Sequence, residues 1–112
     1  IRSVDPLLRR SDAGRALFMT SGVVRNFRAY WGGYAMSKAA LEAIVLTYAA
    51  ECGGTSVAAN LLNPGPLRTR MRQKAMPGED PESLDPPEAV CPLILDLLSP
   101  GCTRNGELVS FK

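Results

Sequence analysis

The sequence contains no histidine among its 112 residues. This absence excludes Ser-His-Asp and Cys-His catalysis within the chain, along with every metal site that needs imidazole ligands, so we expect no metal centre. Cysteine is also scarce, since the three cysteines are odd in number and show no C-x-x-C spacing. That pattern indicates neither a disulfide framework nor a zinc knuckle and favours a cytoplasmic setting. Any acid or base must therefore be another side chain.

An excess of one charge and long apolar runs are missing as well. Thirteen Lys plus Arg against eleven Asp plus Glu leave a net charge of +2, which predicts neither a nucleic-acid partner nor a membrane surface. The longest apolar runs, 39–50 and 90–98, are interrupted by Glu42 and Asp96 and are too short to span a membrane. The start shows no signal-peptide core and no initiator methionine, so we expect the chain to begin within a longer protein.

What is present is an ordinary globular composition in a chain the size of one small domain. Short apolar runs predict buried strands at 15–21 and 55–63, and residues 106–111 alternate as a third strand should. Helix formers predict a helix over 34–52, and a second helix over 86–98 with Asp85 as its N-cap. Strands that alternate with helices predict an α/β fold with a parallel sheet.

Finer predictions concern the first helix and the segment after the second strand. The larger apolar residues of the helix recur at helical spacing and predict its buried face: Leu41, Ile44, Val45 and Tyr48. Residues 66–85 are polar and rich in proline and glycine, which predicts a mobile flap rather than a packed element. Its arginines, Arg68, Arg70 and Arg72, leave phosphate binding and a solvated surface as alternatives.

The loop before the first helix carries two neighbouring aromatic residues. Tyr30 and Trp31 precede the helix at 34–52. Such residues either line a substrate cleft or anchor their own loop, because an aromatic ring buries a large apolar area in both settings. The sequence leaves both interpretations open.

The start of the first helix carries the pattern with most chemical content. Tyr34 and Lys38 stand at i and i+4, which places them on one helix face with Cβ atoms about 5–6 Å apart. An ammonium at that distance stabilises a phenolate, so the phenol can serve as a general acid or base in a protein without histidine. Alone, Tyr-x-x-x-Lys is a weak signal. Here, however, Ser21 closes the preceding strand and Asn63-Pro64-Gly65 closes the following one.

This combination of a strand-ending serine, Tyr-x-x-x-Lys and a Pro-Gly turn resembles the short-chain dehydrogenase/reductase family, from about Leu7 to Phe111. The resemblance implies a Rossmann-like, doubly wound parallel sheet, of which this chain is the C-terminal half with three strands and crossover helices. The residues just before the Tyr-x-x-x-Lys motif look like those of poorly characterised bacterial oxidoreductases. The family resemblance also implies catalysis of the interconversion of a small-molecule carbonyl and a secondary alcohol with NAD or NADP.

Roles for single residues also follow from the resemblance. It implies that Tyr34 exchanges a proton with the substrate oxygen, that Ser21 orients this oxygen, and that Lys38 assists Tyr34 and binds the nicotinamide ribose. The residues implied to bind the nicotinamide end of the cofactor are Tyr34, Lys38, Pro64, Gly65, Leu67 and Thr69.

Two family features are absent from the chain. No Gly-rich pyrophosphate loop occurs, and the upstream asparagine that completes the family's proton relay is missing. Because family members are longer, we expect residues 1–112 to be the C-terminal part of a single domain whose N-terminal, dinucleotide-binding half is absent here. The alternative is a truncated, inactive fragment that serves as a binding or oligomerisation module. The resemblance implies a homodimer or homotetramer.

Overall fold

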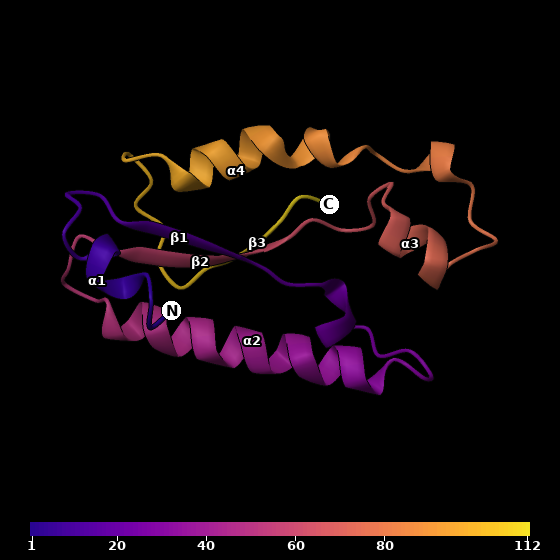
Figure 1. The fold of residues 1–112 in the computed structure, drawn as a ribbon, viewed down its shortest axis with the longest axis horizontal. Coiled ribbons are helices and arrows are strands. Elements are labelled where there is room, and N and C mark those ends of the chain that lie inside the picture. Colours follow the sequence, from indigo (N-terminus) through magenta and orange to yellow (C-terminus); the bar gives the residue numbers. More distant parts are fainter.

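The computed structural model describes all residues 1–112, and a three-stranded sheet forms its centre. The strands β1 (Arg15–Met19), β2 (Ala58–Asn63) and β3 (Leu108–Ser110) lie in the order β1-β2-β3, and both pairings are parallel. Parallel neighbours need long crossover connections, because a hairpin turn cannot join them. The connecting helices lie on both faces of the sheet (Figure 1). The predicted α/β fold with a parallel sheet is therefore confirmed.

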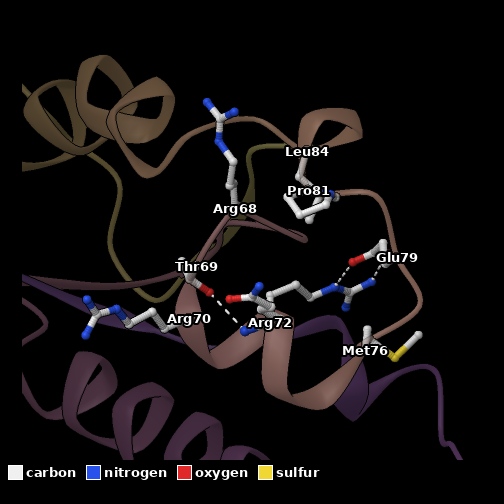
Figure 2. A pocket seen from close by; sticks show the side chains of 9 residues that line it. Arg68, Thr69, Arg70, Arg72, Met76, Glu79, Pro81 and Leu84 are labelled. Atoms are coloured by element: carbon white, nitrogen blue, oxygen red, sulfur yellow. Dashed lines mark hydrogen bonds and ion pairs between the residues drawn. The ribbon is translucent and has the colours of Figure 1, made fainter.

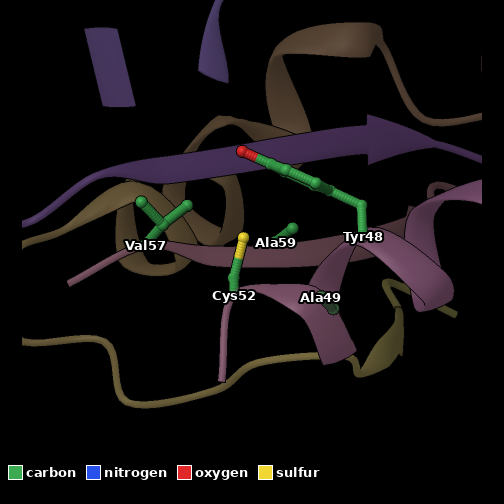
Figure 3. Packing of buried hydrophobic residues seen from close by; sticks show 5 residues of the cluster. All are labelled: Tyr48, Ala49, Cys52, Val57 and Ala59. Carbon is green, nitrogen blue, oxygen red and sulfur yellow. The ribbon is translucent and has the colours of Figure 1, made fainter. Parts of the chain in front are cut away.

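The alternation of side chains along β1 divides the core into two layers. Phe18 packs against a cluster shown in Figure 3, which consists of Tyr48, Ala49, Cys52, Val57 and Ala59. Leu17 packs into the other cluster, with Leu62, Val90 and Leu97. Because successive strand residues point to opposite faces, each layer needs its own helix. The helix α2 (Gly32–Glu51) covers one face, and α4 (Cys91–Leu98) covers the other (Figure 1).

Helix α2 begins two residues before the predicted start, and its buried face only partly matches the predicted one. The prediction is confirmed for Val45 and Tyr48, which are buried, and wrong for Ile44, which is 58% exposed. The inward positions are Ala35, Glu42, Val45, Tyr48 and Ala49. Apolar residues occur all around this helix, so their spacing alone could not decide which face packs on the sheet. No helix of the chain combines the length and the apolarity that a membrane span requires.

The second predicted helix begins later than expected. Residues Pro87–Val90 form the 3-10 turn η3, and α4 starts only at Cys91. Asp85 caps neither element, because its carboxylate pairs with Lys112 and its backbone carbonyl accepts from the Arg68 N–H at 2.9 Å. A contact with the C-terminal residue, distant in sequence, thus takes the carboxylate that a local cap would use.

The carboxyl ends of the strands point toward one end of the molecule. There β1 continues into the 3-10 turn η1 (Gly22–Val24), and β2 leads to the short helix α3 (Arg70–Ala75). The first turn of α2 reaches the same end, whereas α1 (Asp5–Leu8) lies at the opposite one (Figure 1). Open α/β sheets bind ligands beyond the carboxyl ends of their strands. This end is therefore where a site is expected.

The chain exposes more surface than a self-contained domain of its mass. Its accessible surface is 7129 Å², whereas a folded monomer of 12.0 kDa exposes about 6,000 Å². Its radius of gyration of 15.5 Å likewise exceeds the roughly 13 Å expected for this length. Strand β1 pairs on one side only, and Met19 at its end is 40% exposed. The sheet thus stops at an uncovered edge.

Candidate active site

A cleft of about 400 Å³ opens beyond the carboxyl ends of β1 and β2. Its walls come from the η1 segment, the start of α2, the turn after β2 and helix α3. The cleft brings together most of the residues singled out from the sequence, namely Ser21, Tyr34, Pro64, Gly65, Leu67 and Thr69. These six residues lie up to 48 positions apart in the chain and share one concave site.

Ser21 reaches the cleft because it lies between the end of β1 at Met19 and the turn η1, of which it is the N-cap. Its Oγ accepts a hydrogen bond from the Val23 N–H at 3.3 Å, as an N-cap residue does. This bond uses a lone pair of the hydroxyl and leaves the O–H free to donate. Ser21 is therefore both the turn former that the strand end needs and a potential hydrogen-bond donor toward the cleft.

Tyr34 lies in the first turn of α2, beside the loop that precedes the helix. Its ring meets the Trp31 ring edge-on, with ring centres 6.0 Å apart, an arrangement that aromatic pairs favour. Trp31 lines the cleft, whereas Tyr30 is fully exposed and does not. Of the two predicted alternatives, Trp31 therefore lines a cleft. Tyr30 neither lines the cleft nor packs against its own loop.

Lys38 stands behind Tyr34 rather than in the cleft wall. Its Nζ lies 5.9 Å from the centre of the Tyr34 ring and donates to the Met19 carbonyl at 2.9 Å, and it is absent from the cleft lining. An ammonium has three N–H donors, so the bond to Met19 leaves two for other partners. The one-face geometry predicted from the i, i+4 spacing is confirmed.

The turn after β2 forms the opposite wall. The Asn63 side-chain oxygen accepts from the Gly65 N–H at 3.2 Å, the local bond by which asparagine stabilises a turn. Gly65 has φ +70, and a Cβ at its position would meet nothing closer than the Lys112 Cβ at 3.7 Å. The left-handed backbone explains the glycine, and the turn forms part of the cleft lining.

Sequence reasoning did not identify the ion pair that holds the loop after β1. Glu42, with a side chain only 9% exposed, accepts from Thr20 Oγ1 at 2.5 Å and from both Arg25 terminal nitrogens at 3.0 and 2.8 Å. Arg25 lowers the pKa of Glu42, with a smaller lowering by Thr20, while burial opposes the shift. Thr20 and Arg25 flank Ser21 in sequence, so Glu42 anchors the serine's loop on both sides.

A signal for this ion pair was present in the sequence. Glu42 is the only charged residue within the apolar run 39–50. A carboxylate at a core-facing position is costly unless it is paired. Its appearance on the inner face of a helix therefore implies a cationic partner, although the spacing alone could not identify Arg25.

The segment 66–85, predicted to be irregular, folds into α3 and the 3-10 turn η2 (Pro81–Ser83). Its base is closed by a bridge between Leu67 and Asp85. Two Arg–Glu ion pairs link its parts, Arg68–Glu82 at 2.7 Å and Arg72–Glu79 at 2.6 Å, the second of which is drawn in Figure 2. The segment contains more regular structure than expected, but none of its residues is buried. Ion pairs rather than apolar packing hold it.

The three arginines of this flap therefore make different contacts. Arg72 binds both Glu79 oxygens, at 2.6 Å each, and Arg68 holds Glu82. Arg70 is exposed, forms no ion pair and points away from the other two (Figure 2). A common phosphate site for all three is not what the structure shows.

Replacing Glu79 with glutamine is expected to loosen α3. Arg72 lowers the pKa of Glu79, so the carboxylate is charged at neutral pH and the bidentate pair is complete. The pair is lost when pH falls through that lowered pKa. Hydrogen exchange of the α3 amides should become severalfold faster in Glu79→Gln at neutral pH. Glu82→Gln is the matched control, because its side chain is 79% exposed and such pairs contribute little; equal effects of both variants would contradict the prediction.

Comparison with known proteins shows which families and structures the chain resembles. The family model described as enoyl-(acyl carrier protein) reductase matches residues 1–93. The chain is 43% identical over 100 residues to YciK of Escherichia coli K12, described as an uncharacterized oxidoreductase, covering 89% of this chain and 39% of YciK. It is 41% identical over 64 residues to an NADPH-dependent aldehyde reductase-like chloroplast protein of Arabidopsis thaliana, covering 57% of this chain and 24% of that protein.

Solved structures share the fold. A short chain dehydrogenase from Escherichia coli CFT073, complexed with NADPH, matches with a TM-score of 0.91 and 39% identity. The match covers 97% of this chain and 45% of that one. The chain therefore corresponds to less than half the length of each of these proteins.

Proposed function

The chain belongs to the short-chain dehydrogenase/reductase family, and we propose that it is the C-terminal part of an NAD(P)-dependent enzyme that interconverts a carbonyl and a secondary alcohol. The observation that carries this proposal is the single cleft lined by Ser21, Tyr34 and the Pro64-Gly65 turn. A phenol and a serine hydroxyl suit proton transfer to a substrate oxygen, and the turn that contains Gly65 suits the packing of a planar ring.

The side chains around the cleft fit the nicotinamide end of a dinucleotide. Gly65 presents backbone without a side chain in the cleft wall, and Lys38 retains free N–H donors behind the Tyr34 ring. Leu67 and Thr69 extend this wall toward α3, and Thr69 Oγ1 already accepts from the Arg72 N–H at 3.1 Å. When bound, the cofactor supplies or accepts the hydride. NADPH is the first cofactor to test, because a solved relative holds it.

The roles of the protein side chains follow from the charge that develops during carbonyl reduction. Hydride addition places negative charge on the carbonyl oxygen, and groups already aimed at it stabilise that charge as it forms. Ser21 donates a hydrogen bond to the oxygen, and Tyr34 donates the proton that completes the alcohol. The Lys38 ammonium stabilises the phenolate that remains. In alcohol oxidation the same groups act in reverse, with Tyr34 as the base.

We further propose that a dinucleotide-binding half pairs with β1. Strand β1 is the edge nearest the candidate catalytic residues, and it lacks a second neighbour. The unpaired backbone N–H and C=O groups of such a strand edge can form hydrogen bonds with another strand. The excess exposed surface and the partial coverage of the relatives support the same arrangement.

The second candidate is a role in assembly, which the outward face of α2 favours. Met36 and Ile44 on this helix are 70% and 58% exposed, and apolar exposure of this kind is typical of an interface. A homodimer or homotetramer of the complete enzyme would cover it. A catalytically inactive chain that only associates would cover it equally well.

The deciding experiment is cofactor binding and turnover by the full-length protein. Its intact mass is compared first with the 12.0 kDa of this chain. Titrations with NADPH and NADH then measure cofactor binding, and assays of cofactor oxidation with a panel of aldehydes and ketones test the activity. We expect saturable binding of one cofactor, and oxidation of that cofactor that depends on an added carbonyl compound. A mass of 12.0 kDa with no cofactor binding would instead favour the assembly role.

A further inference from the structure

The cleft carries charge of one sign only. Among its lining residues are three cations, Arg28, Arg72 and Lys112, and no carboxylate. Two of them are neutralised by partners outside the lining, since Arg72 pairs with Glu79 and Lys112 with Asp85. Arg28 is exposed and forms no ion pair, although its charge adds to the lowering of the pKa of Glu79 that Arg72 chiefly causes. It is therefore the one cation of the cleft lining that no ion pair neutralises.

Arg28 is held where the loop before α2 meets the flap. Its guanidinium carbon lies 5.6 Å from the centre of the Trp31 ring, and its Nη1 lies 4.0 Å from the Met76 sulfur. Contacts with an aromatic face and a thioether position a guanidinium without neutralising it. The planar fork thus keeps donors for a carboxylate, which arginine binds in a bidentate manner.

The position of Arg28 relates it to the substrate rather than to the cofactor wall. Trp31 contacts Arg28 on one side and Tyr34 on the other, at 5.6 and 6.0 Å between the group centres. The Pro64-Gly65 turn forms the separate wall that we assign to the nicotinamide. Met71 and Ala75 of α3 add apolar surface to the lining. A molecule with its carbonyl at Tyr34 can therefore lie along Trp31 and reach Arg28.

We infer that Arg28 is a specificity-determining residue and that the substrate is a carbonyl compound bearing a carboxylate, separated from the carbonyl by a short apolar or aromatic spacer. This inference rests on the proposed function. The spacer packs against Trp31, and the carboxylate pairs with the guanidinium. A neutral substrate would leave Arg28 without an anion in a cleft that has no carboxylate of its own.

The test measures binding of two matched probes to the full-length protein loaded with NADP⁺, a state in which no ketone can be reduced. The probes are 4-acetylbenzoic acid and its methyl ester, which differ chiefly in charge. Calorimetry should give a dissociation constant about tenfold lower for the acid, the range of a hydrogen bond to a charged group. Arg28→Gln should bring the two constants within about twofold, and Arg28→Lys should retain part of the preference.

Arg70→Gln is the control for loss of charge alone, because Arg70 is an exposed arginine of the flap that lies outside the cleft lining. It should keep the wild-type preference. Equal binding of acid and ester by the wild type overturns the inference, and so does a preference that survives in Arg28→Gln. Weaker NADPH binding by Arg28→Gln with an unchanged probe ratio would assign the cation to the cofactor instead. Failure of the proposed function is recognised separately, as absence of any cofactor binding.

Discussion

Replacing Tyr34 with phenylalanine is expected to lower the kcat of the full-length enzyme for carbonyl reduction by about 10²–10⁴-fold, the usual contribution of a positioned general acid. The ring is retained, so its edge-on contact with Trp31 remains. Only the hydroxyl of this cleft-lining residue is lost. Steady-state kinetics should show this loss, while the dissociation constant for NADPH changes little, because the ring that borders the cleft is unchanged.

The chain offers a matched control for this substitution. Tyr30→Phe removes the same hydroxyl from a fully exposed tyrosine four residues earlier, outside the cleft lining. It should leave kcat unchanged. If Tyr34→Phe retained wild-type turnover, Tyr34 would not be the acid. If it lost turnover and kept its oligomeric state by light scattering, the catalytic proposal would be supported over a role in assembly alone.

Replacing Glu42 with glutamine is expected to lower the free energy of unfolding of the full-length protein by about 1–3 kcal/mol at neutral pH, the value of hydrogen bonds to a buried charged group. The variant retains the size of the side chain but loses the charge that Arg25 binds through two nitrogens. Urea unfolding measures the change. Glu51→Gln, an exposed glutamate at the end of the same helix, should change stability far less.

The pH dependence of this effect has a definite sign. The pKa of Glu42 lies below its ordinary value of 4.5, chiefly because Arg25 donates to it. A group of this kind contributes stability that is fully present above the ordinary pKa and is lost as pH falls through the lowered value. The difference between wild type and Glu42→Gln should therefore be constant near neutrality and shrink below about pH 4.5. A difference that grows on acidification would contradict this assignment.

Glu42 also acts on the candidate active site as a positioning residue. It binds Thr20 and Arg25 on either side of Ser21, so loss of its charge releases the loop that aims the serine hydroxyl. We expect kcat to fall in Glu42→Gln at temperatures well below unfolding, with NADPH affinity unchanged. A variant that is less stable but has wild-type kcat would leave Glu42 with a structural role only.

The local parts of the site were predictable from sequence because short-range geometry determines them. Helical spacing alone places Tyr34 and Lys38 on one side of α2, and the structure shows this arrangement. Ser21 and Asn63-Pro64-Gly65 could be placed at strand ends because turn residues interrupt apolar runs there. The parallel sheet then implied that these ends meet at one edge.

The errors arose where distant segments compete for the same group. Asp85 reads as a helix cap, yet Lys112 takes its carboxylate. Ile44 fits an apolar stripe with Val45 and Tyr48, yet α2 buries Glu42 and Ala49 beside these two and leaves Ile44 exposed. The flap looks irregular because its order comes from Arg–Glu pairs, whose partners cannot be identified from spacing.

The sequence by itself determined the class of fold, the positions of the strand ends and the Tyr34–Lys38 pair, because hydrophobic period, turn chemistry and helical pitch act over a few residues. Only the tertiary structure decided which charges are satisfied. It buried Glu42 against Arg25, closed the flap with Arg72 and Glu79, and left Arg28 beside Trp31 and outside every ion pair. Charge pairing depends on distances between segments far apart in the chain, and folding alone sets those distances.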